Sequence, residues 1–361
     1  MRRRRPAART LVLALVTLAG AACTGDDASP SSAGPAPGSA TANPAVDAPT
    51  IAAVGDLVCA FGTREPPHHA PSGEHGECEP EKVARVVKRG DYDAFLPLGD
   101  LQYSYASLWR FEKYWDRYYG SVFDSTYPVP GNHEAYNGRF MGYFGYFGDR
   151  AHPPGGYYSF DLGSWHLIAL NSQMCLNRVW GLHTHLPSDK TSTGFTRWES
   201  PIPGGGCKPD DPMMTWLDAD LAAHAEDGSC TLAYFHHPAF RWSGSVKGLV
   251  DPVVLPLWKR LAAAGVDVVL TGHQHDYQRW MPMNGQGEPD PDGMESFIVG
   301  TGGDSYQPLP EASDQPDAVV KAHTGTYGVL EMTLEEGSYV YEFIAAEDQA
   351  PFEDAGSRTC H

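Results

Sequence analysis

Short apolar runs that each end in polar residues most strongly limit what this chain can fold into. Runs of this length, bounded by glycine and polar residues, predict strands that are buried on both faces. Amphipathic helical patterns lie between several of them, and this alternation favours an α/β fold. The predicted strands cover residues 51–54, 95–98, 165–170, 232–235, 266–270 and 297–299.

Three segments have the apolar spacing of helices that cover a sheet. Residues 81–89 place three valines on one face before a glycine ends the pattern. Segments 213–224 and 255–264 show similar spacing, and 327–344 alternates around a Glu-Gly-Ser turn that predicts a β-hairpin. We expect one catalytic domain over residues 51–361, a length that sheet-rich α/β domains reach.

The composition argues against several classes of protein. Hydrophobic residues make up 42% of the 361 residues and charged residues 20%, which is too apolar for a disordered chain. The 45 Asp and Glu outnumber the 26 Lys and Arg, giving a formal net charge of −19. A surface this acidic argues against a nucleic-acid scaffold, since such proteins need a basic face.

The first 23 residues resemble an export signal. Arginines at 2–5 precede an apolar run over 11–22 that is too short to span a bilayer. Cys23 lies where a bacterial lipoprotein carries its lipidated cysteine, but Gly20 stands where such signals usually have leucine, so cleavage without lipidation stays open. Residues 24–50, rich in Pro, Ala and Ser, predict a disordered linker. We therefore expect a secreted protein or a surface lipoprotein tethered to the membrane through Cys23.

Six cysteines remain beyond Cys23, and an even number in an exported chain predicts disulfides. We favour the local pairs Cys59–Cys78 and Cys175–Cys207. These leave Cys230 and Cys360 to hold the C-terminal tail. The alternative is that one or two of the cysteines are free buried thiols.

Five polar motifs follow strand-like runs, where α/β sheets bind their ligands. Their Asp, Asn, His and Tyr side chains offer oxygen and imidazole ligands without thiolate, which suits hard or borderline metals. A carboxylate that bridges two ions allows a spacing of about 3.5–4 Å, suited to hydrolysis at phosphorus. The motifs are Gly55-Asp56, Gly99-Asp100-Leu101-Gln102-Tyr103, Gly131-Asn132-His133-Glu134, His236-His237-Pro238 and Gly272-His273-Gln274-His275.

The order of these motifs resembles the calcineurin-type metallophosphoesterase superfamily, from about residue 50 to the end of the chain. Most members carry Asp-X-His at the first motif, but Val58 stands at the histidine position here. Tyr103, three residues after Asp100, stands where purple acid phosphatases carry the replacement ligand. The pattern is therefore most similar to compact purple acid phosphatases, and segments 165–171 and 231–240 resemble secreted actinobacterial members.

The resemblance implies a four-layer αββα sandwich with the motifs at the C-terminal ends of strands. It also implies that His133 and Asn132 contact the substrate phosphate, that His133 helps to protonate the leaving oxygen, and that Glu134 orients His133. His236 is preferred to His237 as a ligand because it begins the His-X-Pro pattern. The implied ligands are Asp56, Tyr103 and His275 for the first metal ion, Asn132, His236 and His273 for the second, and Asp100 as the bridge.

The metals and the reaction follow from the same resemblance. A tyrosine ligand suggests a trivalent ion, because a phenol with a pKa near 10 needs strong charge to ionise; the family precedent is ferric iron beside divalent iron, zinc or manganese. Packing among neighbouring aromatic residues is the alternative role of Tyr103. We expect an acid phosphatase that hydrolyses small phosphate monoesters by metal-activated hydroxide, with no protein partner inferred.

Two other functions stay open at this point. A phosphodiesterase or nucleotide hydrolase would use the same metals in a wider pocket, shaped by segments 173–212 and 239–254. A non-enzymatic surface protein could keep the fold without the chemistry, but such proteins usually lose metal ligands, and all seven implied ligands are present here.

Overall fold

The chain is described by a computed structural model. The predicted signal, Cys23 and nearly all of the 24–50 linker lie outside the described residues. Thr50 already belongs to the first strand, so the folded part begins just before residue 51. No helix in the described part of the chain is long and apolar enough to cross a membrane. The described residues are 48–59, 78–103, 105–136, 140–176, 207–225, 228–245 and 248–361.

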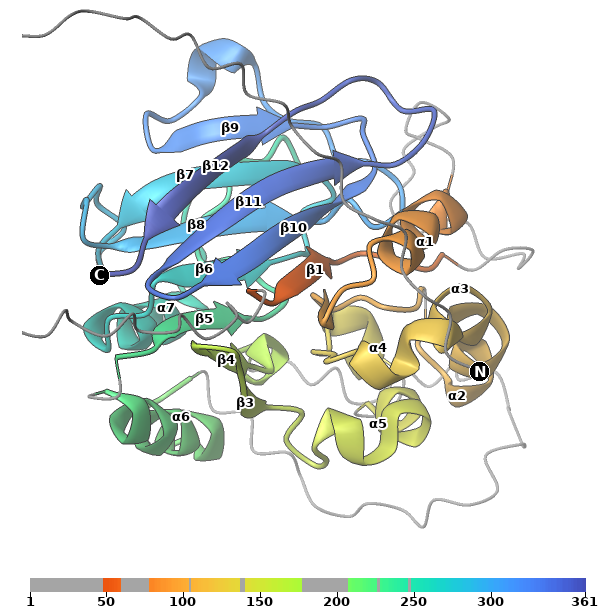
Figure 1. The fold of residues 1–361 in the computed structure, drawn as a ribbon, viewed down its shortest axis with the longest axis horizontal. Coiled ribbons are helices and arrows are strands. Elements are labelled where there is room, and N and C mark those ends of the chain that lie inside the picture. The colour runs from red at the N-terminus through yellow and green to blue at the C-terminus, as the bar shows by residue number, and fades with distance from the viewer. Residues whose placement is uncertain are drawn as a thin grey trace, which may run out of the picture. The chain divides into compact units, whose positions relative to one another are not determined.

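The larger of two mixed sheets has seven strands in the order β3-β4-β5-β6-β8-β7-β9 (Figure 1). The four strands β4, β5, β6 and β8 run parallel, and antiparallel strands flank them. Parallel strands bring their carboxyl ends to one edge, where the sequence places its motifs. The bounds are β3 Tyr158–Leu162, β4 Trp165–Ala169, β5 Cys230–Tyr234, β6 Val268–Thr271, β7 Tyr277–Met283, β8 Met294–Val299 and β9 Val319–His323.

The smaller sheet has five strands in the order β12-β11-β10-β1-β2. Only β1 and β2 pair in parallel, and the predicted hairpin is present as β10 and β11. Gly337 turns this hairpin with a φ of 72°, a conformation that favours glycine. The bounds are β1 Thr50–Val54, β2 Ala94–Pro97, β10 Gly328–Glu335, β11 Ser338–Ala345 and β12 Ala355–Thr359.

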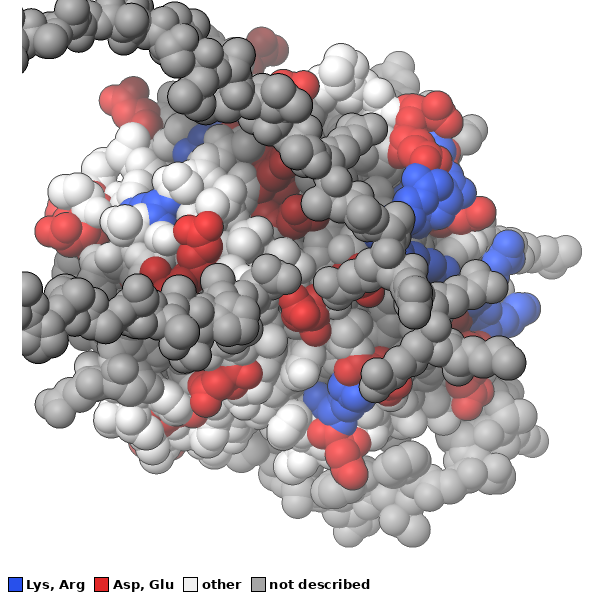
Figure 2. Space-filling model, in the orientation of Figure 1, with Lys and Arg blue, Asp and Glu red and all other residues white. Residues whose placement is uncertain are grey.

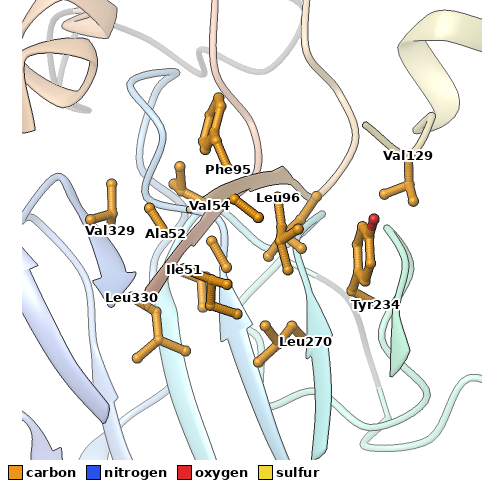
Figure 3. Packing of buried hydrophobic residues seen from close by; sticks show 14 of the residues in the cluster. Ile51, Ala52, Val54, Phe95, Leu96, Val129, Tyr234, Leu270, Val329 and Leu330 are labelled. Atoms are coloured by element: carbon orange, nitrogen blue, oxygen red, sulfur yellow. The ribbon is translucent and has the colours of Figure 1, made fainter. Parts of the chain in front are cut away.

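The main hydrophobic core contains apolar side chains from both sheets (Figure 3). Ile51 and Leu330 come from the smaller sheet, and Leu270 and Tyr234 come from the larger one. Each of these side chains is fully buried. Burying apolar surface from two sheets in one core fixes the sheets to each other and so fixes the loops at their shared edge.

A second core covers the other face of the larger sheet. Along β4, Leu167 belongs to the main core and the adjacent Ile168 to the second core, which also contains Leu217 and Leu257. The alternation explains why the runs are apolar throughout, because both faces are buried. Two predicted helices, α6 Pro212–His224 and α7 Leu255–Ala263, contribute to this second core, and the third, α1 Pro80–Arg89, to the main one.

Residues 108–151 form a chain of short helices beside the smaller sheet (Figure 1). Phe111 and Trp115 are buried there, so most of the aromatic residues of this stretch serve packing. The elements are α2 Leu108–Arg110, a π-helix Phe111–Trp115, α3 Asp116–Tyr119, a 3₁₀ helix Gly120–Ser125, α4 Asn132–Tyr136, α5 Met141–Phe147 and a 3₁₀ helix Gly148–Ala151. Two further 3₁₀ turns span Ser172–Met174 and Ala312–Asp314.

The six predicted strands are confirmed, with ends shifted by up to three residues. The structure also contains the three expected disulfides, Cys59–Cys78, Cys175–Cys207 and Cys230–Cys360. The last joins the start of β5 to the C-terminal tail across 130 residues of sequence. The α/β fold with two stacked sheets, predicted from the sequence, is therefore confirmed.

Charged side chains on the face shown in Figure 2 are mostly acidic and widely scattered, and the basic ones occur in small groups. Around α1, Arg85 pairs with Glu81 and Glu347, and Arg89 also pairs with Glu347. These exposed pairs each contribute little to stability. Their effect is to neutralise Arg85 and Arg89.

Candidate metal centre

Four of the five motifs follow named strands, as the sequence predicts. Asp56 follows β1, Asp100 follows β2, His236 follows β5 and His273 follows β6. The prediction is wrong for the Gly131 motif, which follows no strand. Residues 126–130 make only isolated parallel bridges, at Thr126 and Val129, because Pro128 and Pro130 lack the N–H groups that a ladder needs.

The side chains expected to bind the first metal ion meet around the hydroxyl of Tyr103. This hydroxyl lies 2.8 Å from Asp56 Oδ1 and 3.0 Å from His275 Nε2. His275 Nε2 is in turn 3.3 Å from Asp56 Oδ1. The three side chains are buried, and two oxygen atoms and one nitrogen atom from them face a common point.

The side chains expected to bind the second ion meet around His236 Nε2. That nitrogen lies 3.1 Å from Asn132 Oδ1 and 3.2 Å from His273 Nδ1. The amide nitrogen of Asn132 donates to the hydroxyl of Tyr136 at 3.1 Å, so its oxygen faces the cluster. His236 therefore lies between these two side chains, and His237 also places one ring nitrogen within 4.8 Å of ligand atoms of His236 and His273.

Asp100 belongs to both groups. Its Oδ2 lies 3.3 Å from the Tyr103 hydroxyl and 3.1 Å from His236 Nε2. One ligand atom from each of Asp56, Asp100 and His236 also lies within 4.8 Å of the other two. A carboxylate shared between two donor groups is the element that a dinuclear centre requires.

Hydrogen bonds orient the histidines for metal binding. His236 Nδ1 donates to the carbonyl of Leu98 at 2.8 Å, and His275 Nδ1 donates to the carbonyl of Ser305 at 2.6 Å. Each Nε2 consequently directs its lone pair into the cluster. Metal-bound histidines in proteins are held in this way through their second nitrogen. The donors fit a pair of hard or borderline metal ions.

The electrostatics of the cluster favour a cation. Burial lowers the pKa of both His236 and His275, but nearby carboxylates outweigh it. Asp100 raises the pKa of His236 to about 9, and Asp56 raises the pKa of His275 to about 10. Burial would raise the pKa of Asp100, yet His236 and His133 hold it well below its usual range. Buried carboxylates thus attract positive charge, which a proton or a metal ion can provide.

Three of the candidate ligands have an unusual backbone conformation. Asp56, Asp100 and His273 have φ angles of 62°, 49° and 71°, in the left-handed region that favours glycine. Strained non-glycine residues gather at functional sites because the surrounding fold holds them there. The turns that follow β1, β2 and β6 thereby aim all three side chains at one point.

His133 lies beside the shared carboxylate. Its backbone N–H donates to Asp100 Oδ1 at 2.8 Å, and its Nε2 lies 3.8 Å from Asp100 Oδ2. The ring packs on Tyr103 with a centroid separation of 4.2 Å. His133 is thus next to both donor groups, where the resemblance places a substrate-contacting residue.

Glu134 contacts the backbone, whereas the sequence suggests that it orients His133. Its carboxylate accepts hydrogen bonds from the N–H groups of Leu101, Gln102 and Gly131 at 2.8–3.2 Å. The bond to Gly131 is the backward contact of a capping box at the start of α4. Glu134 therefore braces the loop that carries Asp100.

Sequence reasoning missed two residues beside the cluster. Asp304 Oδ2 lies 3.7 Å from His275 Nδ1, and Ser172 Oγ lies 2.9 Å from His237 Nδ1. The glycines at 300, 302 and 303, which follow the predicted strand at 297–299, are the sequence signal that could have identified the loop of Asp304. A Cβ on Gly302 would lie 2.2 Å from the carbonyl of Gly55, so this loop packs directly against the first motif.

The two segments expected to shape the pocket are only partly described. Most of 173–212 lies outside the described residues. In 239–254, Arg241 pairs with Asp251 at 2.9 Å, and its backbone bonds to Leu249. This ion pair closes the second segment on itself, and the backbone of Trp242 bonds to the side chain of Gln278 on β7.

Comparison with known families matches residues 49–277, more than half of the chain, to the calcineurin-like phosphoesterases. The matched region includes every motif from Asp56 to His275. Purple acid phosphatase 18 of Arabidopsis thaliana is 33% identical over 92 residues, which is 25% of this chain and 21% of that protein. Human acid phosphatase type 7 is 28% identical over 316 residues, covering 80% of this chain and 66% of that protein. The chain thus spans less than two thirds of each of these relatives.

Solved structures support the fold. The purple acid phosphatase PPD1 from yellow lupin seeds superposes with a TM-score of 0.59 at 15% identity, over 86% of this chain and 54% of that chain. GAP50, described as the anchor in the inner membrane complex of Plasmodium, gives 0.58 at 12% identity over 87% and 90%. A dimetal phosphatase from Danio rerio gives 0.53 at 14% identity over 87% and 100%. At these identities the likeness extends to the fold alone.

Proposed function

This chain belongs to the calcineurin-like phosphoesterase family, and we propose that it is an exported, purple acid phosphatase-like enzyme that hydrolyses phosphate monoesters. The observation that carries the proposal is the position of the Asp100 carboxylate, within 3.3 Å of Tyr103 in one donor group and His236 in the other. A dimetal site of this kind is typical of the family. The two phosphatases among its relatives support a monoester as the substrate.

The proposed ligands divide as the motifs suggest, with Asp100 shared between the ions. When bound, the two ions would supply activation of water and neutralisation of phosphoryl charge. Burial, Asp56 and Asp100 all raise the pKa of the Tyr103 hydroxyl well above its ordinary value. Only a strongly charged cation can ionise a hydroxyl in such a place, so we assign ferric iron beside Tyr103 and a divalent ion to the other group.

The remaining roles belong to residues at the start of α4. Asn132 presents its amide beside His236 and would contact the phosphate there. His133 is held by its backbone bond to Asp100 and would hydrogen-bond the phosphate and give a proton to the leaving oxygen. No serine or cysteine nucleophile is needed, because water attacks phosphorus directly.

Export is part of the proposal and rests on three features. The three disulfides of the folded domain suit an oxidising compartment. The first 23 residues have the pattern of an export signal, and the linker behind them, residues 24–50 rich in Pro, Ala and Ser, is long enough to act as a tether. We propose that Cys23 anchors the protein to the outer face of the membrane.

The test compares the full-length holoenzyme on a chromogenic phosphate monoester and on its bis-ester across pH. The proposal predicts a clear preference for the monoester, loss of activity on chelation, and recovery when metal is returned. Preference for the bis-ester would instead assign a phosphodiesterase with the same centre. Inactivity on both esters in metal-replete protein would contradict the enzymatic proposal.

A further inference from the structure

A second group of metal-binding side chains lies at the opposite end of β4 from the dinuclear cluster. Asp161 on β3, His166 on β4 and His224 at the end of α6 each place one ligand atom within 4.8 Å of the other two. Figure 1 shows α6 beside the β3–β4 pair, and the hydrogen bond from Ser159 to Asp220 joins them at 2.6 Å. None of these residues belongs to the motifs of the family.

The ring of His166 is clamped between two carboxylates. Its Nδ1 lies 2.8 Å from Asp161 Oδ1, and its Nε2 lies 3.1 Å from Asp220 Oδ2. A neutral imidazole carries one proton, so one of its nitrogens would face a carboxylate with its lone pair. The arrangement therefore needs a cation between His166 and a carboxylate, either a second proton or a metal ion.

His224 presents a ready ligand next to it. Its Nδ1 donates to the backbone carbonyl of Asp220 at 2.8 Å, which leaves the lone pair of Nε2 available. The His166 Nε2–H group can donate to the Asp220 carboxylate in the same manner. The lone pair of His166 Nδ1, which faces Asp161, is then available to bind an ion. The Asp220 carboxylate thus orients His166 through its second nitrogen, as such partners do in metal sites.

We propose that Asp161, His166 and His224 bind a borderline divalent metal cation such as Zn²⁺. Two imidazoles and one carboxylate are the ligands that zinc accepts, with water completing the tetrahedron. The ion would tie the C-terminal end of α6 to the β3–β4 hairpin. It would act as a structural ion, separate from hydrolysis.

The surroundings allow the ion to enter and the ligands to adjust. The Asp161 side chain is 70% exposed, whereas that of His166 is 2% exposed. Both histidines line a surface cavity of about 370 Å³. Their rings are stacked with centroids 3.6 Å apart, so ligation by both requires the half-buried His224 ring to turn at the end of its helix.

The site is independent of the proposed function. His166 lies near the start of β4, and the loop after β4 leads to Ser172, which contacts His237 beside the dinuclear cluster. The three steps of strand from His166 to Ala169, at about 3.3 Å each, already separate the two ends of β4 by about 10 Å. Losing one site should therefore leave the other intact.

The test is a Zn²⁺ titration of the full-length holoenzyme by calorimetry, with the catalytic metals already in place. We expect one additional equivalent to bind and to raise the unfolding temperature. His224→Gln should weaken this binding at least about tenfold, and Asp161→Asn, a change at an exposed carboxylate that leaves the core untouched, should do the same. Monoester hydrolysis should be unchanged in both variants.

The control is His152→Gln, which removes an exposed histidine that stacks on Tyr158 outside the cluster. It should bind the extra equivalent as the wild type does. Absence of additional Zn²⁺ binding in the wild type would overturn the proposal, and so would wild-type affinity in both His224→Gln and Asp161→Asn.

Discussion

The carboxylate of Asp100 accepts the backbone N–H of His133 at 2.8 Å through Oδ1, while its Oδ2 faces the ligand cluster. One side chain therefore fixes the start of α4 relative to the turn after β2. Asn132 and His133 enter the site on that helix, so their positions depend on the residue that we assign as the bridge. Glu134 reinforces the link from the other direction, through Leu101 and Gln102.

Gly131 sits where this link leaves no room for a side chain. A Cβ there would lie 2.2 Å from Asp100 Oδ1 and 2.4 Å from its backbone nitrogen. Gly131→Ala should therefore displace Asp100 and lower kcat/KM on a phosphate monoester at least about tenfold, as lost support of a metal ligand does. Gly145→Ala on α5 is the matched control, because its Cβ would meet Leu108 at an ordinary 3.4 Å. Equal activity in the two variants would contradict the packing argument.

Tyr103 should give the holoenzyme a visible colour if its phenolate binds ferric iron. Tyr103→Phe removes the only atom that can ligate, so the charge-transfer absorption should disappear and iron content should fall. Tyr105→Phe, at the surface of the same aromatic stretch, should keep the colour. Absorption spectra with iron analysis provide the check, and an unchanged spectrum in Tyr103→Phe would assign Tyr103 to packing.

His133 should matter most when the leaving group is poor. A general acid contributes about 10²–10⁴-fold, and an activated leaving group needs little of this help. His133→Asn should therefore reduce kcat at least about a hundredfold on an alkyl phosphate and much less on a nitrophenyl phosphate. Steady-state kinetics on the two esters test the role, and equal losses on both would limit His133 to phosphate binding.

His323, on the edge strand β9, should make stability depend on pH. Burial lowers its pKa below the ordinary value of 6.5, and the nearby Lys321 adds to this. The unfolded chain then binds more protons near pH 6, so the contribution of His323 is present above pH 6.5 and is lost as the pH falls. Between pH 8 and 5.5, wild type should lose more unfolding free energy than His323→Gln. Urea titrations provide the measurement, and equal losses of unfolding free energy in the wild type and His323→Gln would contradict the lowered pKa of His323.

Much of the fold could be predicted because its central strands are buried on both faces. Residues 165–170 and 232–235 were predicted as strands for this reason, and the structure has strands at 165–169 and 230–234. The polar residues that follow these runs indicated where the metal cluster lies. The edge strand β12, with sequence Ala-Gly-Ser-Arg-Thr, has no apolar pattern and could not be predicted. It is held by pairing with β11 and by the Cys230–Cys360 disulfide, which are both long-range contacts.

The contacts around the ligands were harder to predict than the ligands themselves. Glu134 stands next to His133 in sequence, but its partners lie on the loop at 101–102, which the fold alone brings near. Pro128 and Pro130 also prevent the strand that the sequence predicts before Gly131. The cluster of Asp161, His166 and His224 had no sequence motif, because its ligands come from a hairpin and a distant helix.

Turnover in Asp100→Asn most directly tests the claim that one carboxylate bridges two metal ions. The amide can still accept the N–H of His133, so the variant should fold and unfold as the wild type does. We predict that it binds less metal and hydrolyses a chromogenic monoester at least about a hundredfold more slowly, whereas the exposed Asp292→Asn keeps wild-type turnover. Wild-type turnover in folded Asp100→Asn would contradict the dinuclear account.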